Sequence, residues 1–78
     1  MPSLRAIANR MQTALAMRGR LISINQYQSF SEKAGRMVTK FVCSEKNEKG
    51  KYRTVFESWQ LAEIVKFLAG ELNGGGDG

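Results

Sequence analysis

The chain contains no histidine, one cysteine and one proline among its 78 residues. The absence of histidine excludes a histidine general base and any zinc site built from Cys and His ligands. The single Cys43 cannot form an internal disulfide, and it lacks the partner base that a nucleophilic thiol needs. We therefore predict a buried free thiol at Cys43, no metal, no cofactor and no enzymatic activity.

Long apolar runs are also absent. No stretch approaches the roughly 18 residues of a membrane span or contains the apolar core of about 7–15 residues that a secretory signal needs. We therefore expect no membrane partner and a reducing, cytoplasmic setting. Residues 1–31 contain four arginines and no acid, so an organelle transit peptide is the alternative interpretation of this segment.

Apolar residues make up 42% of the chain and charged residues 24%, which is typical of a globular domain. We expect one small domain over residues 1–72, followed by a flexible glycine-rich tail over 73–78. Domains of this size often need an additional source of stability. Because disulfides and Cys/His metal sites are excluded, self-association is the expected source.

Two helices are predicted, one near each end of the chain. The first covers residues 4–18, with Ser3 as its N-cap and Gly19 as its stop. Its apolar stripe recurs at helical spacing and consists of Leu4, Ile7, Ala8, Met11, Ala14 and Leu15. The second helix is predicted from Ser58, as N-cap, to Leu72.

Three strands are predicted between the helices, over residues 21–30, 36–44 and 51–57. Because Leu21, Ile22 and Ile24 break strict alternation, we expect a bulge or bend in the first strand. Short connections favour an antiparallel meander. The fold class is therefore α+β, a two-layer α-β-β-β-α domain with both helices on one face of a three-stranded sheet.

Pairing the second and third strands across an even-numbered loop assigns their two faces. The face expected beneath the helices contains Met37, Thr39, Phe41, Cys43, Tyr52, Thr54 and Phe56. The opposite face contains Arg36, Val38, Lys40, Val42, Lys51, Arg53, Val55 and Glu57. A register change of one residue would move one strand's side chains to the other face, so the pattern depends on the loop.

The basic face supports two interpretations. It is either a solvated surface whose long cationic side chains cover the valines, or a site that contacts nucleic-acid phosphates with little sequence preference. The predicted nucleic-acid-binding residues are Arg36, Lys40, Lys51, Arg53, Arg5, Arg10, Arg18 and Arg20. The arginines of residues 1–31 are alternatively the solvated face of an ordinary helix.

Trp59 and Phe67 lie off the apolar stripe of the second helix. Trp59 either folds onto the sheet edge or the first helix, as tryptophans are usually buried, or forms a partner interface together with Phe67. An exposed strand edge adds a further route to pairing with another chain. The alternative function is therefore a protein-interaction or homo-oligomerisation module that does not bind nucleic acid.

The element order resembles that of the double-stranded-RNA-binding domain. The resemblance covers topology only. That family uses a lysine-rich start of its second helix against phosphates, and such a start is absent from this sequence. Here that start reads Ser58, Trp59, Gln60, Leu61. Fold analogy by itself does not define a function.

Overall fold

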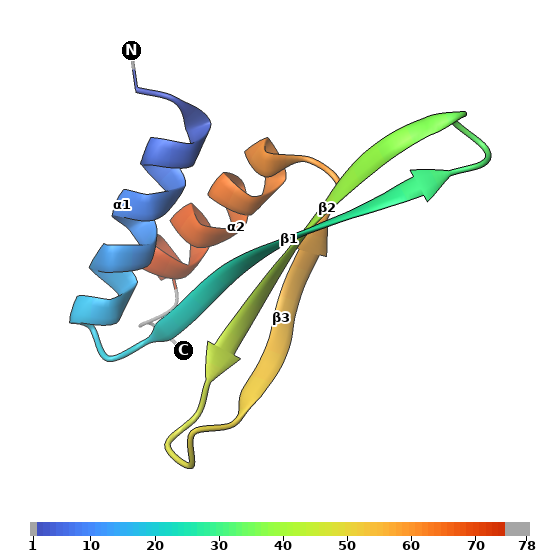
Figure 1. Cartoon of the computed structure of the whole chain (residues 1–78). Helices are drawn as coiled ribbons and strands as arrows, with labels where there is room; N and C mark the ends of the chain where they lie inside the picture. Colours follow the sequence, from blue (N-terminus) through green and yellow to red (C-terminus); the bar gives the residue numbers. More distant parts are fainter. Residues whose placement is uncertain (1, 75–78) are drawn as a thin grey trace.

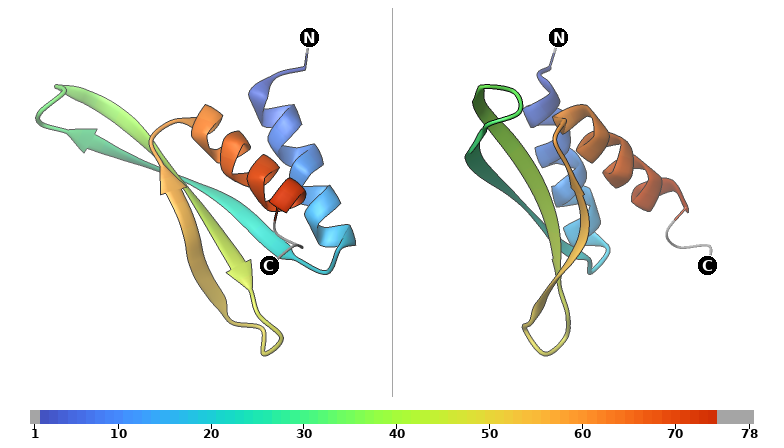
Figure 2. Two further views of the ribbon diagram at one scale, coloured as in Figure 1. Left: turned by 180° about the vertical axis from the view of Figure 1, so that it is seen from behind. Right: turned by 90° about the vertical axis from the view of Figure 1, so that its right-hand side faces the viewer.

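The computed structural model describes residues 2–74 and has the predicted element order (Figure 1). The elements are α1 (Leu4–Met17), β1 (Leu21–Ser31), β2 (Arg36–Lys46), β3 (Tyr52–Ser58) and α2 (Leu61–Gly74). The strands form one antiparallel sheet in the order β1-β2-β3. Both helices lie on the same side of this sheet, as the right-hand view of Figure 2 shows. The predicted α+β class and layering are confirmed.

Both ends of α1 follow from its sequence. The hydroxyl of Ser3 accepts a hydrogen bond from the backbone N–H of Ala6 at 3.1 Å, which confirms the predicted N-cap. At the other end, the N–H of Gly19 donates to the carbonyl of Ala16, and the N–H of Arg20 donates to the carbonyl of Leu15. This pair of bonds is a Schellman motif, and it requires the positive φ of 85° that Gly19 adopts.

The sheet is longer than the helices that cover it. Each helix has 14 residues, or about 21 Å at about 1.5 Å per residue. β1 and β2 have 11 residues each, or about 37 Å at about 3.4 Å per residue. The excess forms an arm, residues 25–40, that projects away from the helices (Figures 1 and 2). The radius of gyration of 13.7 Å accordingly exceeds the roughly 11.5 Å expected for a compact chain of this length.

The core lies where the helices meet the inner ends of the strands. Its buried members are Ala8, Leu15, Ile22, Phe41, Cys43, Ile64 and Leu68. Every element except β3 contributes at least one of these residues, and Phe56 of β3 packs against them. The Cys43 thiol is fully buried, and this burial raises its pKa to about 11. The expected buried free thiol is therefore confirmed.

A bulge in β3 changes which side chains share a face. Cys43 pairs with Phe56 but Ser44 pairs with Thr54, so Val55 is the extra residue on β3. Val55 and Phe56, adjacent in sequence, both pack against the core, which strict alternation would not allow. A bulge or bend was predicted for residues 21–30, but β1 pairs with β2 without any register shift. The bulge is absent there because Leu21 simply remains half-exposed at the start of a regular strand.

The bounds of α2 also differ from the prediction. Ser58 ends β3 rather than capping the helix, and its hydroxyl accepts a hydrogen bond from the N–H of Gln60 at 3.2 Å. The helix therefore begins three residues later, at Leu61. It continues through residues 73 and 74, which were predicted to belong to the tail, while residues 75–78 of that tail lie outside the described residues.

Replacement of Leu68 by alanine tests the core. Leu68 is fully buried on the α2 face that meets the sheet and α1. We expect Leu68→Ala to lower the free energy of unfolding by about 2–5 kcal/mol through lost burial and a residual cavity. Leu4→Ala, at a half-exposed position of α1, is the matched control and should cost less than about 1 kcal/mol. Urea denaturation followed by circular dichroism measures both, and equal losses would contradict this core assignment.

Candidate functional site

The four cations predicted to share one sheet face do not do so. Lys40 and Arg36 lie on the face away from the helices, which we call the outer face, because they alternate with the buried Phe41 and Cys43. Arg53 pairs with Glu45, on the face that the helices cover. Lys51 lies in the turn before β3. The predicted basic face is therefore wrong.

The physical reason is the Val55 bulge. It moves every β3 residue before it to the opposite face, so Tyr52 and Thr54, predicted beneath the helices, lie on the outer face opposite Lys46 and Ser44. The Nζ of Lys46 lies 6.0 Å from the ring centroid of Tyr52, which is consistent with this shared face. Val55, predicted on the outer face, packs against the core instead.

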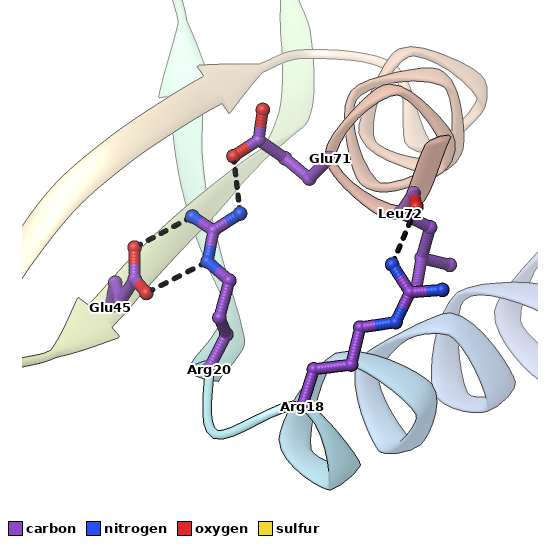
Figure 3. A network of polar contacts seen from close by, with 5 residues as sticks. All are labelled: Arg18, Arg20, Glu45, Glu71 and Leu72. Atoms are coloured by element: carbon purple, nitrogen blue, oxygen red, sulfur yellow. Dashed lines mark hydrogen bonds and ion pairs between the residues drawn. The ribbon is translucent and has the colours of Figure 1, made fainter. Parts of the chain in front are cut away.

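Arg20 holds three elements together rather than facing solvent (Figure 3). The Schellman motif at the end of α1 turns the chain so that the guanidinium enters between β2 and α2. It donates from Nε and Nη2 to the two carboxylate oxygens of Glu45, at 3.1 and 2.9 Å, and from Nη1 to Glu71 at 2.7 Å. Bidentate pairs of this kind are among the strongest polar contacts in proteins. Both of its charged partners belong to the domain itself.

Charge and hydrogen bonding at this network shift two pKa values. Hydrogen bonds from Arg20 lower the pKa of Glu45, and the nearby charge of Arg53 acts in the same direction. The bonds to Glu45 and Glu71 raise the pKa of Arg20. Arg18 is also engaged, because its Nη1 donates to the carbonyl of Leu72 at 2.6 Å, near the C-terminus of α2. A cation there is favoured by the helix dipole.

Lys40 is the third predicted binding residue with an intramolecular partner. Its Nζ lies 2.6 Å from Oε1 of Glu57 and 5.5 Å from the ring centroid of Trp59. Within the described part of the chain, Arg5, Arg10, Arg36, Lys51 and Arg53 form no ion pair and are exposed. These five lie on α1, at the tip of the arm and on the hairpin between β2 and β3, so the structure does not bring them together.

The hairpin between β2 and β3 carries a compact group of cations. We call residues 46–53 the basic hairpin. Its four exposed bases are Lys46, Lys49, Lys51 and Arg53. Glu48 is the only acid in this segment. The sequence analysis missed Lys46 and Lys49 because it considered only strand residues assigned to one face of the sheet. A count of charged residues along the loop would have found both lysines.

The free edge of β1 is the second unusual feature. In residues 2–74, β1 pairs only with β2, so its other edge is unpaired. The strand reads LISINQYQSFS and contains no charge and no proline. Within β1, residues 25–30 are exposed. The start of the strand lies beside α1, because Leu21–Ser23 and residues of α1 line a common hollow. Long, regular, uncharged edges invite pairing with another strand, and natural sheets usually protect them with charges, proline or bulges.

The opposite edge of the sheet is protected in this way. β3 has only 7 residues, carries the Val55 bulge and contains Arg53 and Glu57. The two edges of one sheet therefore differ in length, charge and regularity. The absence of charge from residue 21 to residue 31 is the sequence signal that could have identified β1 as the open edge.

Exposed apolar side chains gather on the arm. Tyr27, Phe30 and Met37 are 57%, 62% and 55% exposed, and Phe30 and Met37 lie directly opposite each other. Trp59 is 58% exposed and lines a shallow hollow with Phe30 and Val38. Of the two predicted residues of a partner interface, Trp59 is thus placed against the arm.

Phe67 does not belong to this exposed group. Its ring stacks on that of Phe56, with centroids 4.7 Å apart and planes 3° from parallel, and it packs against the core. The alternative in which Phe67 and Trp59 form one exposed patch is wrong, because Phe56 faces the helices as predicted and gives Phe67 a partner within the domain.

Comparison with known proteins gives no assignment: no protein family, no curated protein and no solved structure matches this chain. In the part of the chain that the structure describes, neither helix is long and apolar enough to cross a membrane. The fold and the two surface features define this chain as a small two-layer α+β domain with an open strand edge and a basic hairpin.

Removal of Arg20 tests the network that joins α1, β2 and α2. We expect Arg20→Ala to lower the free energy of unfolding at pH 7 by about 1–3 kcal/mol, because two partly buried carboxylates lose their cation. Arg36→Ala, which removes an exposed arginine without an ion pair, should change it by less than about 0.5 kcal/mol.

The same network predicts a dependence of stability on pH. Arg20 lowers the pKa of Glu45 in the folded state, so the contribution of this pair is complete above the ordinary glutamate pKa of about 4.3 and is lost as the pH falls below it. The difference in unfolding free energy between the wild-type chain and Arg20→Ala should therefore shrink from pH 7 to pH 3. A constant difference would contradict the assigned role of Glu45.

Proposed function

We propose that this chain is a non-enzymatic interaction module that self-associates by strand addition along the free edge of β1. The observation that carries the proposal is the contrast between the two sheet edges. β3 is short, bulged and charged, whereas β1 is long, regular and uncharged. Main-chain hydrogen bonds along such an edge supply affinity, and the side chains on either side supply selectivity.

The arm supplies the apolar surface that strand addition needs. Tyr27, Phe30 and Met37 project from the paired strands, and Trp59 lines a hollow with Phe30 and Val38. Aromatic residues and methionine are enriched at interfaces, and charged residues are depleted from interface centres. A cytoplasmic, reducing location is part of the proposal and agrees with the buried thiol of Cys43.

A second copy is the proposed partner for two reasons. A domain of 78 residues has a small core, and association adds buried area that the single chain lacks. The net charge of +5 makes copies repel each other, so a contact between copies is favoured where charge is absent. β1 provides such a place.

Charges placed on the β1 edge test self-association. The double variant Gln26→Lys with Gln28→Lys adds two cations to exposed positions of the arm. We expect the wild-type chain to form dimers and this variant to raise the dissociation constant at least about tenfold, which corresponds to about 1.4 kcal/mol. Sedimentation equilibrium across micromolar to millimolar concentrations measures this change.

Two further variants serve as controls in that experiment. Thr54→Lys adds a cation to the β3 edge and should leave the dimer unchanged. Trp59→Ala should weaken the dimer less than the double variant, because Trp59 only flanks the arm. A wild-type chain that is monomeric at millimolar concentration, or a Thr54→Lys variant that dissociates equally, would contradict the proposal.

Phosphate binding by the basic hairpin is a second candidate function. One observation favours it: four exposed bases and one acid lie within residues 46–53, next to the exposed ring of Tyr52. Lysine and arginine bind nucleic-acid phosphates with release of counterions, so affinity falls steeply with salt. Arg5 and Arg10 on α1 are the alternative cations for the same chemistry.

Paired charge removals distinguish these two surfaces. Lys49→Gln with Lys51→Gln should weaken binding to a duplex probe and reduce the salt slope by about 0.9 per lost phosphate contact. Arg5→Gln with Arg10→Gln removes the same charge from α1 and should have a smaller effect. Fluorescence anisotropy between low and physiological salt measures both, and absence of binding at low salt would remove this function.

A further inference from the structure

The open part of β1 is self-complementary in one register. Residues 21–23 lie beside α1, with which they line a common hollow, and the hairpin turn follows residue 31, so the part of β1 open to an added strand is residues 24–31. A two-fold axis perpendicular to the sheet keeps the helix-covered faces of both copies on the same side. Side chains that lie directly opposite each other must point to the same face of the sheet, and side chains alternate between faces along the strand. An odd-numbered residue therefore faces an odd-numbered residue of the other copy, and an even-numbered residue faces an even-numbered one.

Only two symmetric registers use seven residues of this segment. With Tyr27 on the axis, Ile24 faces Phe30 of the other copy, and Gln26 faces Gln28 of the other copy. With Gln28 on the axis, Gln26 faces Phe30 and Asn25 faces Ser31. The first register places an apolar side chain beside an apolar side chain and an amide beside an amide. The second register places the aromatic ring of Phe30 against the amide of Gln26.

We infer that two copies pair antiparallel through residues 24–30 of β1, with Tyr27 on the two-fold axis, to form a continuous six-stranded sheet. This inference rests on the proposed self-association. Directly opposed aromatic side chains on neighbouring strands stabilise a sheet, so the two Tyr27 rings strengthen the centre of the contact. Phe30 of each copy extends the core of the other, because Ile24 already packs against that core.

The charges around the axis permit this contact. No residue of β1 is charged. Lys40 lies opposite Tyr27 on β2, but its ammonium group is paired with Glu57 at 2.6 Å. Arg36 and Lys33 lie at the tip of the arm, four or more residues from the axis along the hairpin. The repulsion expected from a net charge of +5 is therefore smallest at the centre of this contact.

Single cysteines on the arm distinguish the two registers. Across an antiparallel pair, directly opposite Cβ atoms lie about 4.5–5.5 Å apart, which is close enough for a disulfide after small adjustment. We expect Tyr27→Cys to form a disulfide-linked dimer roughly ten times faster than Gln28→Cys under the same mild oxidant. The wild-type chain controls for Cys43, which is buried and should not react.

A mixed experiment keeps Tyr27 in place. Asn25 faces Ser29 of the other copy in the inferred register, so mixing Asn25→Cys with Ser29→Cys should give mainly the heterodimer. Faster linkage of Gln28→Cys, or homodimers of Asn25→Cys as the main product, would overturn this register while leaving strand addition in place. A chain that is monomeric in sedimentation would instead overturn the proposed self-association itself.

Discussion

The structure depends on a difference in length between its two layers. Helices of 14 residues cannot cover strands of 11 residues, because a residue advances the chain more than twice as far in a strand as in a helix. The inner halves of β1 and β2 are buried by α1 and α2, and the outer halves form the arm. The exposed Phe30 and Met37 follow directly from this difference, since they lie on the helix side of the sheet at positions that no helix reaches. Tyr27 lies opposite Lys40 on the outer face, which carries no helix.

Within the covered half, one arginine organises the polar contacts. Arg20 follows the Schellman motif of α1 and reaches Glu45 on β2 and Glu71 on α2, while Arg18 meets the end of α2. These contacts hold both helices against the sheet at the end away from the arm. They also engage two cations within the domain, so the exposed cations without an intramolecular partner lie on the basic hairpin, on α1, at the tip of the arm and at Lys66 of α2.

The two edges of the sheet differ in their structure. The Val55 bulge lets two adjacent apolar residues reach the core, and it also makes β3 short and irregular at its exposed edge. β1 has no bulge, no charge and no proline, and its outer half has no helix over it. In the proposed self-association a strand is added at one edge only, and this geometry favours a closed pair of copies over an open filament.

Local sequence signals determined the element order, the Ser3 cap, the Gly19 stop and the burial of Cys43, because caps, turns and periodicity act over a few residues. They left open whether Trp59 folds onto the domain or contacts a partner. The faces of β3 were decided only in the tertiary structure, since the competition of Val55 and Phe56 for one core is not visible in alternation alone. The same holds for Arg18, Arg20 and Lys40, whose partners Leu72, Glu71 and Glu57 are distant in sequence and become neighbours only when the layers pack.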